Sequence, residues 1–384
     1  MSFCFSKPSK LHAQKPLKIG FLVASIELGS NVAYAKAIYA LKALYPCKLI
    51  VFGNTITTAL YSQAKHIDHL IDIAINTWQI ADKSPTAQKS YAPLRAKQIA
   101  TISSFSCDYL ILSDAKSAFL RFALATNAKR VLCARKFISL LAPRARTLPI
   151  YSKPKYKSMP FEHILLHLVR MIDTARYDEY IHSIPLLANA RLHASPKVQE
   201  KIDKIFTYKN ARYWGGGGLL APCRSGHDEA ILDSRFVLVN PFNHNSRFSL
   251  PESAWLDLIE ELLAHDYPVL LITYPSVHKT FMHALIARGL ARKIFVFAND
   301  TNLGNLIAMV GKAHYCISPS TGTIHLALNL GLKCIGLYPS YDQGRWGSEQ
   351  LTYITLTTPR NELDSGACAT LIAQTMETLK SLES

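Results

Sequence analysis

The feature that most constrains the fold is an alternation of short apolar runs with helical stretches, which occurs in two series along the chain. The runs have the length and the β-branched character of buried strands, and the stretches between them carry apolar residues at helical spacing. This rhythm is typical of a parallel sheet covered by helices on both faces. The expected strands are residues 18–24, 47–53, 108–114 and 130–134 in the first series, and 236–240, 267–275, 293–298, 314–319 and 333–339 in the second.

Two series predict two domains, and a length of 384 residues fits that number. The expected fold class is α/β, with two Rossmann-like domains that face one another across a cleft. Open parallel sheets bind ligands beyond the carboxyl ends of their strands, so the cleft is the expected ligand site. We predict an amino-terminal domain at residues 1–185, a connector at 186–235 and a carboxyl-terminal domain at 236–384, whose last helix is a candidate to cross back.

The connector contains the glycine-rich run YWGGGG at residues 213–218. Such a run can form a phosphate loop, but no lysine follows it to complete that motif. A flexible connector is therefore the favoured interpretation of this segment.

One helix start in the second series is explicit. Ser249 and Glu252 have the spacing of a capping box, and Pro251 falls inside the expected first turn. The sequence therefore predicts that the Ser249 side chain caps this helix.

The sequence ISPSTGTIHLALNLG, residues 317–331, passes from a strand into a helix through small polar residues. The first amides of a helix lack partners within it, and with the helix dipole they favour an anion such as a pyrophosphate. Gly322 would let the backbone approach that anion closely. The alternative is that a hydroxyl caps the helix and the histidine packs in the core. The polar groups at this turn are Ser320, Thr321, Thr323 and His325.

Two further strand ends in the same series are polar. Asn240 and Pro241 end one strand, and Arg247 follows shortly before the next helix, where a guanidinium could meet a phosphate. A surface arginine that covers the loop is the alternative. The third polar strand end is YPSYDQGRWG, residues 338–347. Three such ends in one domain favour a nucleotide site.

The formal charge of +16 is unevenly spread. From residue 115 to residue 161 the chain has no acidic residue, and such a block attracts phosphates, an anionic membrane or nucleic acid. A solvated basic face is the alternative, and no nucleic-acid-binding motif is present. The basic residues of the block are Lys116, Arg121, Lys129, Arg130, Arg135, Lys136, Arg144, Arg146, Lys153, Lys155 and Lys157.

The remaining composition favours a cytoplasmic protein. No apolar run is long enough to span a membrane, and the amino terminus lacks the apolar core of a signal peptide. The eight cysteines are scattered without a CxxC pair, which suits reduced thiols better than disulfides or a zinc site.

The carboxyl half resembles glycosyltransferase family 9, the heptosyltransferases. The signature of that family is matched by STGTIHLALNLGLKCIGLYPS at residues 320–340 and by Arg345-Trp346-Gly347. Further matches are Asn240-Pro241, Ser246-Arg247, SLPESAW at 249–255 and the approach helix at 302–318. In the amino half, residues 24–41 and 108–130 are collinear with the family's first loop and its Lys-Ser and Ala-Lys-Arg run.

The resemblance implies a GT-B fold, with the acceptor in the amino domain and a sugar nucleotide in the carboxyl domain. It implies transfer of heptose from ADP-heptose to the inner core of lipopolysaccharide, without a metal because no DxD pair or ligand cluster appears. The implied nucleotide-sugar-binding residues are Asn240, Ser246, Arg247, Ser320, Thr321, Gly322, Thr323, His325 and Arg345.

The sequence departs from the family pattern at two carboxylates. Ser30 stands at the loop aspartate that would be the general base, and Ser320 stands at the aspartate that opens the carboxyl motif. A serine does not accept the acceptor's proton unaided at neutral pH. Glu27, three residues earlier, and Asp114, at another strand end, are candidates to replace it.

The basic block lies in the expected acceptor domain. Lys116 and Arg121 are the expected acceptor contacts because they are nearest a strand end, and the rest of the block would face the inner surface of the membrane. If neither Glu27 nor Asp114 acts as base, the rival hypothesis is a catalytically silent sugar-nucleotide-binding protein. A nucleic-acid-binding protein is a distant third.

Overall fold

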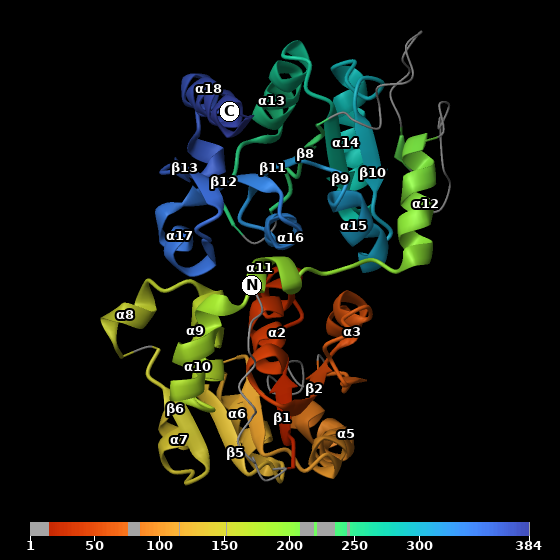
Figure 1. Cartoon of the computed structure of the whole chain (residues 1–384). Coiled ribbons are helices and arrows are strands. Elements are labelled where there is room, and N and C mark those ends of the chain that lie inside the picture. The colour runs from red at the N-terminus through yellow and green to blue at the C-terminus, as the bar shows by residue number, and fades with distance from the viewer. Residues whose placement is uncertain are drawn as a thin grey trace, which may run out of the picture.

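The computed structural model describes residues 15–75, 85–114, 116–150, 152–207, 219–220, 235–243 and 246–383. Each half of the molecule contains one sheet with helices on both faces, and the two halves face one another (Figure 1). The predicted α/β fold with two Rossmann-like halves is thereby confirmed. The glycine-rich run at 213–218 and most of the amino-terminal segment lie outside the described residues.

The amino-terminal sheet has six parallel strands in the order β3-β2-β1-β4-β5-β6. The four strands expected from the sequence form its centre, whereas the edge strands β3 and β6 were not anticipated because they are short and only partly apolar. The strands are β1 (Leu17–Leu22), β2 (Cys47–Gly53), β3 (His69–Asp72), β4 (Tyr109–Leu112), β5 (Arg130–Ala134) and β6 (Ala145–Leu148).

The carboxyl-terminal sheet has seven strands in the order β13-β12-β11-β8-β9-β10-β7. All neighbouring strands are parallel except β7, a two-residue edge strand that runs antiparallel to β10. The strands are β7 (Leu219–Leu220), β8 (Val237–Val239), β9 (Val269–Thr273), β10 (Phe295–Ala298), β11 (Tyr315–Pro319), β12 (Lys333–Pro339) and β13 (Leu351–Leu356).

Alternation along the strands gives each sheet two buried faces. On β1, Phe21 contributes to the core under α2 and α9, and Leu22 contributes to the opposite core under α5 and α6. The helices of the amino half are α1 (Leu28–Ala33), α2 (Ala35–Leu44), α3 (Thr55–Tyr61), α5 (Pro85–Ser104), α6 (Ser117–Ala125), α7 (Phe137–Leu140), α8 (Pro154–Lys157), α9 (Phe161–Arg170) and α10 (Thr174–Tyr180).

In the carboxyl half, one face of the sheet packs on α13, α14 and α18, and the other packs toward α15 and α16. The helices of this half are α13 (Glu252–Ala264), α14 (Pro275–Ala287), α15 (Leu303–Val310), α16 (Gly322–Leu330), α17 (Ser340–Trp346) and α18 (Ser365–Glu383).

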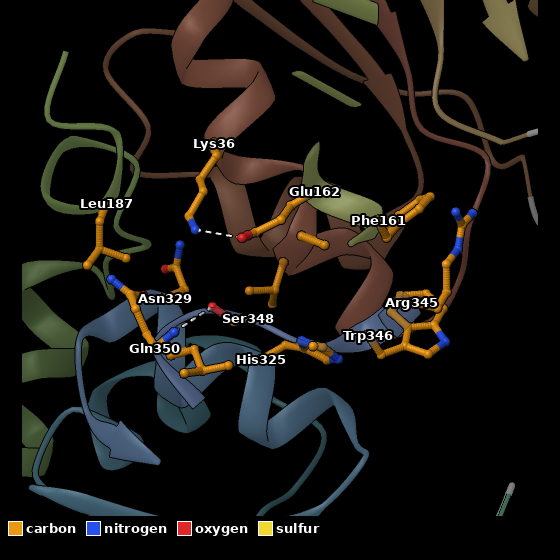
Figure 2. A pocket seen from close by; sticks show the side chains of 14 residues that line it. Lys36, Phe161, Glu162, Leu187, His325, Asn329, Arg345, Trp346, Ser348 and Gln350 are labelled. Carbon is orange, nitrogen blue, oxygen red and sulfur yellow. Dashed lines mark hydrogen bonds and ion pairs between the residues drawn. The ribbon is translucent and has the colours of Figure 1, made fainter. Parts of the chain in front are cut away.

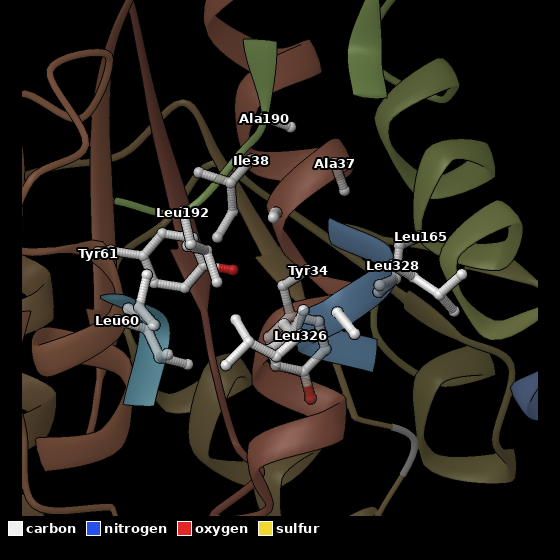
Figure 3. Packing of buried hydrophobic residues seen from close by; sticks show 14 of the residues in the cluster. Tyr34, Ala37, Ile38, Leu60, Tyr61, Leu165, Ala190, Leu192, Leu326 and Leu328 are labelled. Atoms are coloured by element: carbon white, nitrogen blue, oxygen red, sulfur yellow. The ribbon is translucent and has the colours of Figure 1, made fainter. Parts of the chain in front are cut away.

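One hydrophobic core runs through both halves. Tyr34 and Ile38 of the amino half belong to the same buried cluster as Leu326 and Leu328 of α16 (Figure 3). The apolar contact fixes α1 and α16 beside one another where the two halves meet. The halves are therefore held together by buried apolar surface as well as by the chain that links them.

The expected connector is partly folded. Within residues 186–235, α11 (Leu186–Asn189) packs on α2 of the amino half, and α12 (Pro196–Thr207) packs on α15 of the carboxyl half. The buried side chain of Asn329 joins this segment to α16, since its Nδ2 donates to Ala190 O at 3.0 Å and its Oδ1 accepts from Leu192 N at 2.8 Å. The segment is thus fastened to the domain interface.

Two local expectations were wrong. The last helix, α18, does not cross back: it packs on α13, β12 and β13 of its own half, where its buried side chains Met376 and Leu379 complete the core. The expected capping box is also absent from the described chain, because α13 begins at Glu252 with Pro251 as its N-cap. Ser249 is instead buried and accepts a hydrogen bond from Trp255 Nε1 at 3.2 Å.

The helices and the cysteines were also the subject of expectations from the sequence. None of the helices in the described part of the chain is long and apolar enough to span a bilayer. The six described cysteines, Cys47, Cys107, Cys133, Cys316, Cys334 and Cys368, are free and buried.

Candidate active site

The turn between β11 and α16 leaves the start of the helix open to a ligand. Thr321 is the N-cap residue, yet its side chain makes no capping hydrogen bond within the described chain. Its Oγ1 instead accepts from Asn240 Nδ2 at 3.0 Å and lies 2.9 Å from Ser318 Oγ. The Thr321 hydroxyl therefore does not cap the helix. The first amides of α16 are left available to bind an anion.

Two asparagines after β8 position this turn. Asn240 is buried and donates to both Ser318 Oγ and Thr321 Oγ1 at 3.0 Å, so it organises the turn without lining the cavity beside it. Asn243 does line that cavity; its Nδ2 donates to Ser320 O at 3.0 Å, and its Oδ1 accepts from Ser246 N at 3.0 Å. Asn243 was not among the residues expected from the sequence.

The carboxyl-side cavity, of about 530 Å³, opens between this turn and the start of α1. Both halves of the molecule line it, and none of its described lining residues is a lysine or arginine. The lining residues are Glu27, Leu28, Gly29, Ser30, Phe242, Asn243, Ser246, Ser320, Thr321, Gly322, His325, Tyr341, Asp342 and Trp346.

Two glycines let the halves meet at the floor of this cavity. A β-carbon on Gly322 would lie 2.8 Å from Leu28 Cβ and 3.0 Å from Gly29 N, and one on Gly29 would lie 2.9 Å from His325 Cδ2. Real β-carbons do not come so close to other atoms. The starts of α1 and α16 therefore approach one another only because both positions lack a side chain.

His325 is a neutral group in this site. Burial lowers the pKa of its imidazole to about 4. A neutral imidazole donates from one ring nitrogen only, so at neutral pH His325 offers a hydrogen bond but no charge. Its ring centroid lies 5.8 Å from that of Trp346, and both rings border a small pocket that also contains the Lys36–Glu162 ion pair (Figure 2).

The predicted arginines lie at the borders of the cavity. Arg247 is exposed, with its guanidinium 5.4 Å from the centroid of the Phe248 ring, and it is adjacent in the chain to the lining residue Ser246. Arg345 lines the small pocket and a second large cavity, in the amino half, with its guanidinium 5.0 Å from the Phe161 ring centroid (Figure 2). Thr323 lies outside the three cavities named here.

The amino-side cavity, of about 330 Å³, lies beyond the carboxyl ends of β1, β4 and β5. Its wall is largely apolar and aromatic, and its polar groups include both candidate bases and two cations. The lining residues are Ser25, Ile26, Glu27, Ser30, Tyr34, Leu112, Ser113, Asp114, Lys116, Ala134, Ile150, Phe161, Ile164, Leu165, Leu168, Arg345 and Trp346.

The two candidate bases differ in position. Glu27, the exposed N-cap residue of α1, lines both cavities, and so does the buried Ser30. Asp114 lines only the amino-side cavity, where its Oδ1 accepts from Lys116 N at 2.8 Å and its Oδ2 lies 3.9 Å from Lys116 Nζ. Glu27 is therefore the candidate that could reach groups in both cavities.

Only one of the two predicted acceptor contacts, Lys116 and Arg121, lies at a cavity. Lys116 lines the amino-side cavity, with a side chain that is 64% exposed. Arg121 is exposed on α6 and lines none of the three cavities named here. The reason is helical geometry: five residues beyond Lys116, the side chain has turned away from the strand ends.

Two residues that were not expected from the sequence also lie in the site. Trp346 lines both large cavities and the small pocket, and Asp342 lines the carboxyl-side cavity. Burial raises the pKa of the Asp342 carboxyl. Both residues lie in the third polar strand end, at 338–347. The sequence therefore indicated the segment but not which of its side chains line the cavity.

One family model matches part of the sequence. Residues 186–367 match the model of glycosyltransferase family 9 (heptosyltransferase). No curated protein matches the sequence.

Several solved structures share the whole fold. The glycosyl transferase family 9 structure from Veillonella parvula has a TM-score of 0.69 at 11% identity, covering 96% of this chain and 98% of that one. The Escherichia coli ADP-heptose lps heptosyltransferase II has a TM-score of 0.65 at 15% identity, covering 96% and 100%. Escherichia coli heptosyltransferase WaaC with ADP-2-deoxy-2-fluoro heptose has 0.63 at 13%, covering 94% and 99%.

These identities are low, so the structural likeness concerns the fold, and the family match concerns the carboxyl-terminal part. The chain thus has the two-domain GT-B fold of heptosyltransferase structures, and its resemblance to glycosyltransferase family 9 is confirmed by the match over residues 186–367.

Proposed function

We propose that the protein is an inverting glycosyltransferase that moves heptose from ADP-heptose to the inner core of lipopolysaccharide. The family match supports sugar transfer in general. The sugar and the nucleotide are proposed because solved structures of this fold include heptosyltransferases bound to ADP and to an ADP-heptose analogue. In this proposal residues 236–384 hold the nucleotide sugar, residues 1–185 hold the acceptor, and 186–235 connect them.

The observation that carries the proposal is that Glu27 lines both large cavities. An acceptor hydroxyl in the amino-side cavity would lose its proton to the Glu27 carboxylate as its oxygen attacks the anomeric carbon from the other cavity. The bond from that carbon to the diphosphate oxygen breaks, and the nucleotide diphosphate leaves with the electron pair. Attack from the face opposite the leaving group inverts the anomeric carbon. Ser30, beside Glu27, could bind the acceptor hydroxyl but would not ionise.

The charge on the leaving diphosphate has two candidate partners. The open amides of α16 begin at Gly322 in the carboxyl-side cavity, and donors aimed at a developing negative charge are the most effective kind. Arg247 is adjacent to the lining Ser246 and would add the positive charge that the described lining lacks. With these groups the proposed transfer needs no metal.

The proposed place of action is the cytoplasmic face of the inner membrane. The lipopolysaccharide core carries negative charge at a membrane surface, and the acid-free stretch at residues 115–161 belongs to the amino half. Lys116, at the rim of the amino-side cavity, is the proposed acceptor contact. Arg121, which lies away from that cavity, would contribute only to long-range attraction.

A panel assay tests the proposal. Purified protein is given ADP-, GDP- and UDP-sugars with and without deacylated lipopolysaccharide core. The expected result is consumption of ADP-heptose that depends on the acceptor. Binding of a sugar nucleotide without turnover across the whole panel would contradict transfer and favour the silent binding protein, because the general base would then have been lost with the aspartate that Ser30 replaces.

A further inference from the structure

Three large apolar side chains are exposed together on the short helix α7 and its C-cap residue, in the amino half. Phe137 is 79% exposed, Leu140 61% and Leu141 70%. On a helix the positions i, i+3 and i+4 share one face, so the three side chains point in the same direction. We call Phe137, Leu140 and Leu141 the α7 patch.

The patch is held rigidly. Between its members, Ile138 packs against the core under α5 and α6, and Ser139 is buried. The Ser139 hydroxyl accepts from Lys136 N at 2.9 Å and donates to Lys136 O at 2.6 Å, which closes the turn at the start of α7. The apolar face is therefore presented outward by a fixed backbone, and it is not a frayed end.

The charged residues directly before the patch, and those on the two elements that α7 packs against most, are basic. Arg135 and Lys136 precede it, and the elements on which α7 packs carry Arg121 on α6 and Arg146 on β6 as their only charged residues. Arg135, Arg121 and Arg146 are exposed. Arg144, just after the patch, donates to the carbonyls of Thr126 and Ala128 at the end of α6, so it serves the fold. These basic side chains would attract an anionic surface.

We infer that the α7 patch is the element by which the protein docks on an anionic lipid bilayer. Exposed apolar side chains enter the boundary between headgroups and acyl chains, and flanking basic side chains bind anionic headgroups. The inference deepens the membrane part of the proposed function. The patch lies near the acceptor side of the site, because α7 packs at the β6 edge of the amino sheet (Figure 1), and the end of β5 and the chain beyond β6 supply Ala134 and Ile150 to the amino-side cavity.

A second copy of the chain fits the patch less well. Stable protein interfaces bury on the order of 800 Å² on each partner, far more than three side chains provide. The same basic groups would also face one another across a symmetric contact, in a protein of formal charge +16. Nucleic acid would satisfy the charges but would leave the apolar side chains in water.

Vesicle co-sedimentation of the full chain tests the inference. The expected result is binding to vesicles of phosphatidylcholine mixed with phosphatidylglycerol, and little binding to phosphatidylcholine alone. Leu140→Ser with Leu141→Ser should weaken partitioning at least about tenfold, because two buried leucines are lost from the interface. Ile286→Ser, at a 61% exposed position on α14, is the matched control and should bind as the parent does.

Equal binding of the double variant and the parent would overturn the inference. So would a parent dimer that the double variant converts to monomer, or tighter binding to RNA than to the mixed vesicles. Phe137→Trp gives an independent readout: its emission should shift to the blue with mixed vesicles, and an unchanged emission would also overturn the inference.

The result is separable from the proposed transfer. Nucleotide-sugar binding measured without vesicles should be the same in the double variant and the parent. Vesicle binding by a protein that turns over no sugar nucleotide would contradict the transferase proposal alone, whereas turnover without vesicle binding would contradict the α7 patch alone.

Discussion

The two large cavities occupy equivalent places in their half-molecules but differ in how they could bind charge. Each lies beyond the carboxyl ends of parallel strands, and Glu27, Ser30 and Trp346 belong to both. The amino-side cavity has the cations Lys116 and Arg345 beside a largely apolar wall. The carboxyl-side cavity has no lysine or arginine in its described lining, and instead has a helix start and the neutral His325.

The difference teaches that the same fold can prepare two kinds of anion site. Backbone amides at a helix start are fixed in place and suit a diphosphate of constant geometry. Lysine and arginine side chains are long and adaptable, and suit an acceptor whose charged groups are spread over its surface. Glu27, between them, is the group on which the comparison depends most.

The largest expected effect concerns Glu27. Glu27→Gln should lower the transfer rate roughly a hundred- to ten-thousand-fold, the usual contribution of a general base, with little change in nucleotide affinity. Asp114→Asn should have a smaller effect because Asp114 lines one cavity only. Steady-state kinetics with Glu377→Gln, an exposed position on α18, as control measures both. A larger loss in Asp114→Asn would move the base to the acceptor side.

The second prediction concerns the protonation of His325 in the carboxyl-side cavity. Burial lowers the pKa of this imidazole from 6.5 to about 4, so the unfolded chain binds the proton first as the pH falls. Stability is therefore complete above pH 6.5 and declines toward pH 4, by up to about 3 kcal/mol. His325→Gln should remove this part of the pH dependence.

Urea unfolding at a series of pH values measures the decline. The control is His283→Gln, which exchanges a histidine at an exposed position on α14, away from both large cavities. If His325→Gln leaves the slope between pH 6.5 and 4 unchanged, then burial does not lower the pKa of His325, and the folded protein carries a charged imidazole below about pH 6.5.

The third prediction concerns the contact that joins the cavities. Gly322→Ala places a β-carbon 2.8 Å from Leu28 Cβ and 3.0 Å from Gly29 N, so the starts of α1 and α16 must move relative to one another. Overpacking of this kind costs about 1–3 kcal/mol, which we expect as a roughly ten- to hundredfold loss of transfer rate. Urea unfolding and steady-state kinetics measure the two losses. Gly366→Ala, whose β-carbon would meet no atom closer than 3.5 Å, is the control, and equal kinetics of the two variants would rule out the tight contact as a requirement.

The smallest effect concerns Arg247. Its guanidinium lies over Phe248 outside the carboxyl-side cavity, yet it is adjacent in sequence to a lining residue. Arg247→Ala should weaken ADP-sugar binding about tenfold, the value of one charge-assisted hydrogen bond. Calorimetry against the exposed control Arg292→Ala measures it. Unchanged affinity would mean that helix amides alone carry the diphosphate, and would sharpen the contrast between the cavities.

Much of the fold could be predicted because its signals are local. The strands in the centre of each sheet are continuous apolar runs, and β5 was predicted with its observed bounds, Arg130–Ala134. The helix start at Gly322 was visible as a turn of small residues. The edge strands β3, β6 and β13 were missed because they are half-exposed and carry weak patterns.

The errors in local detail arose where a side chain had two possible partners. Ser249 has capping-box spacing, but burial beside the indole of Trp255 gave its hydroxyl a different role. Asn240 looked like a ligand residue, yet it binds Ser318 and Thr321. Spacing along the chain does not report which of these partners wins, because the competitors come from other elements.

The sequence by itself therefore determined the two parallel sheets, the polar strand ends and the unequal distribution of charge, since periodicity and composition act within a segment. Only the tertiary structure decided that Glu27 borders both cavities, that Arg121 and Arg247 lie outside them, that α18 stays in its own half and that the α7 patch faces outward. Each of these depends on which elements pack against one another, and that packing is set by burial summed over the whole chain.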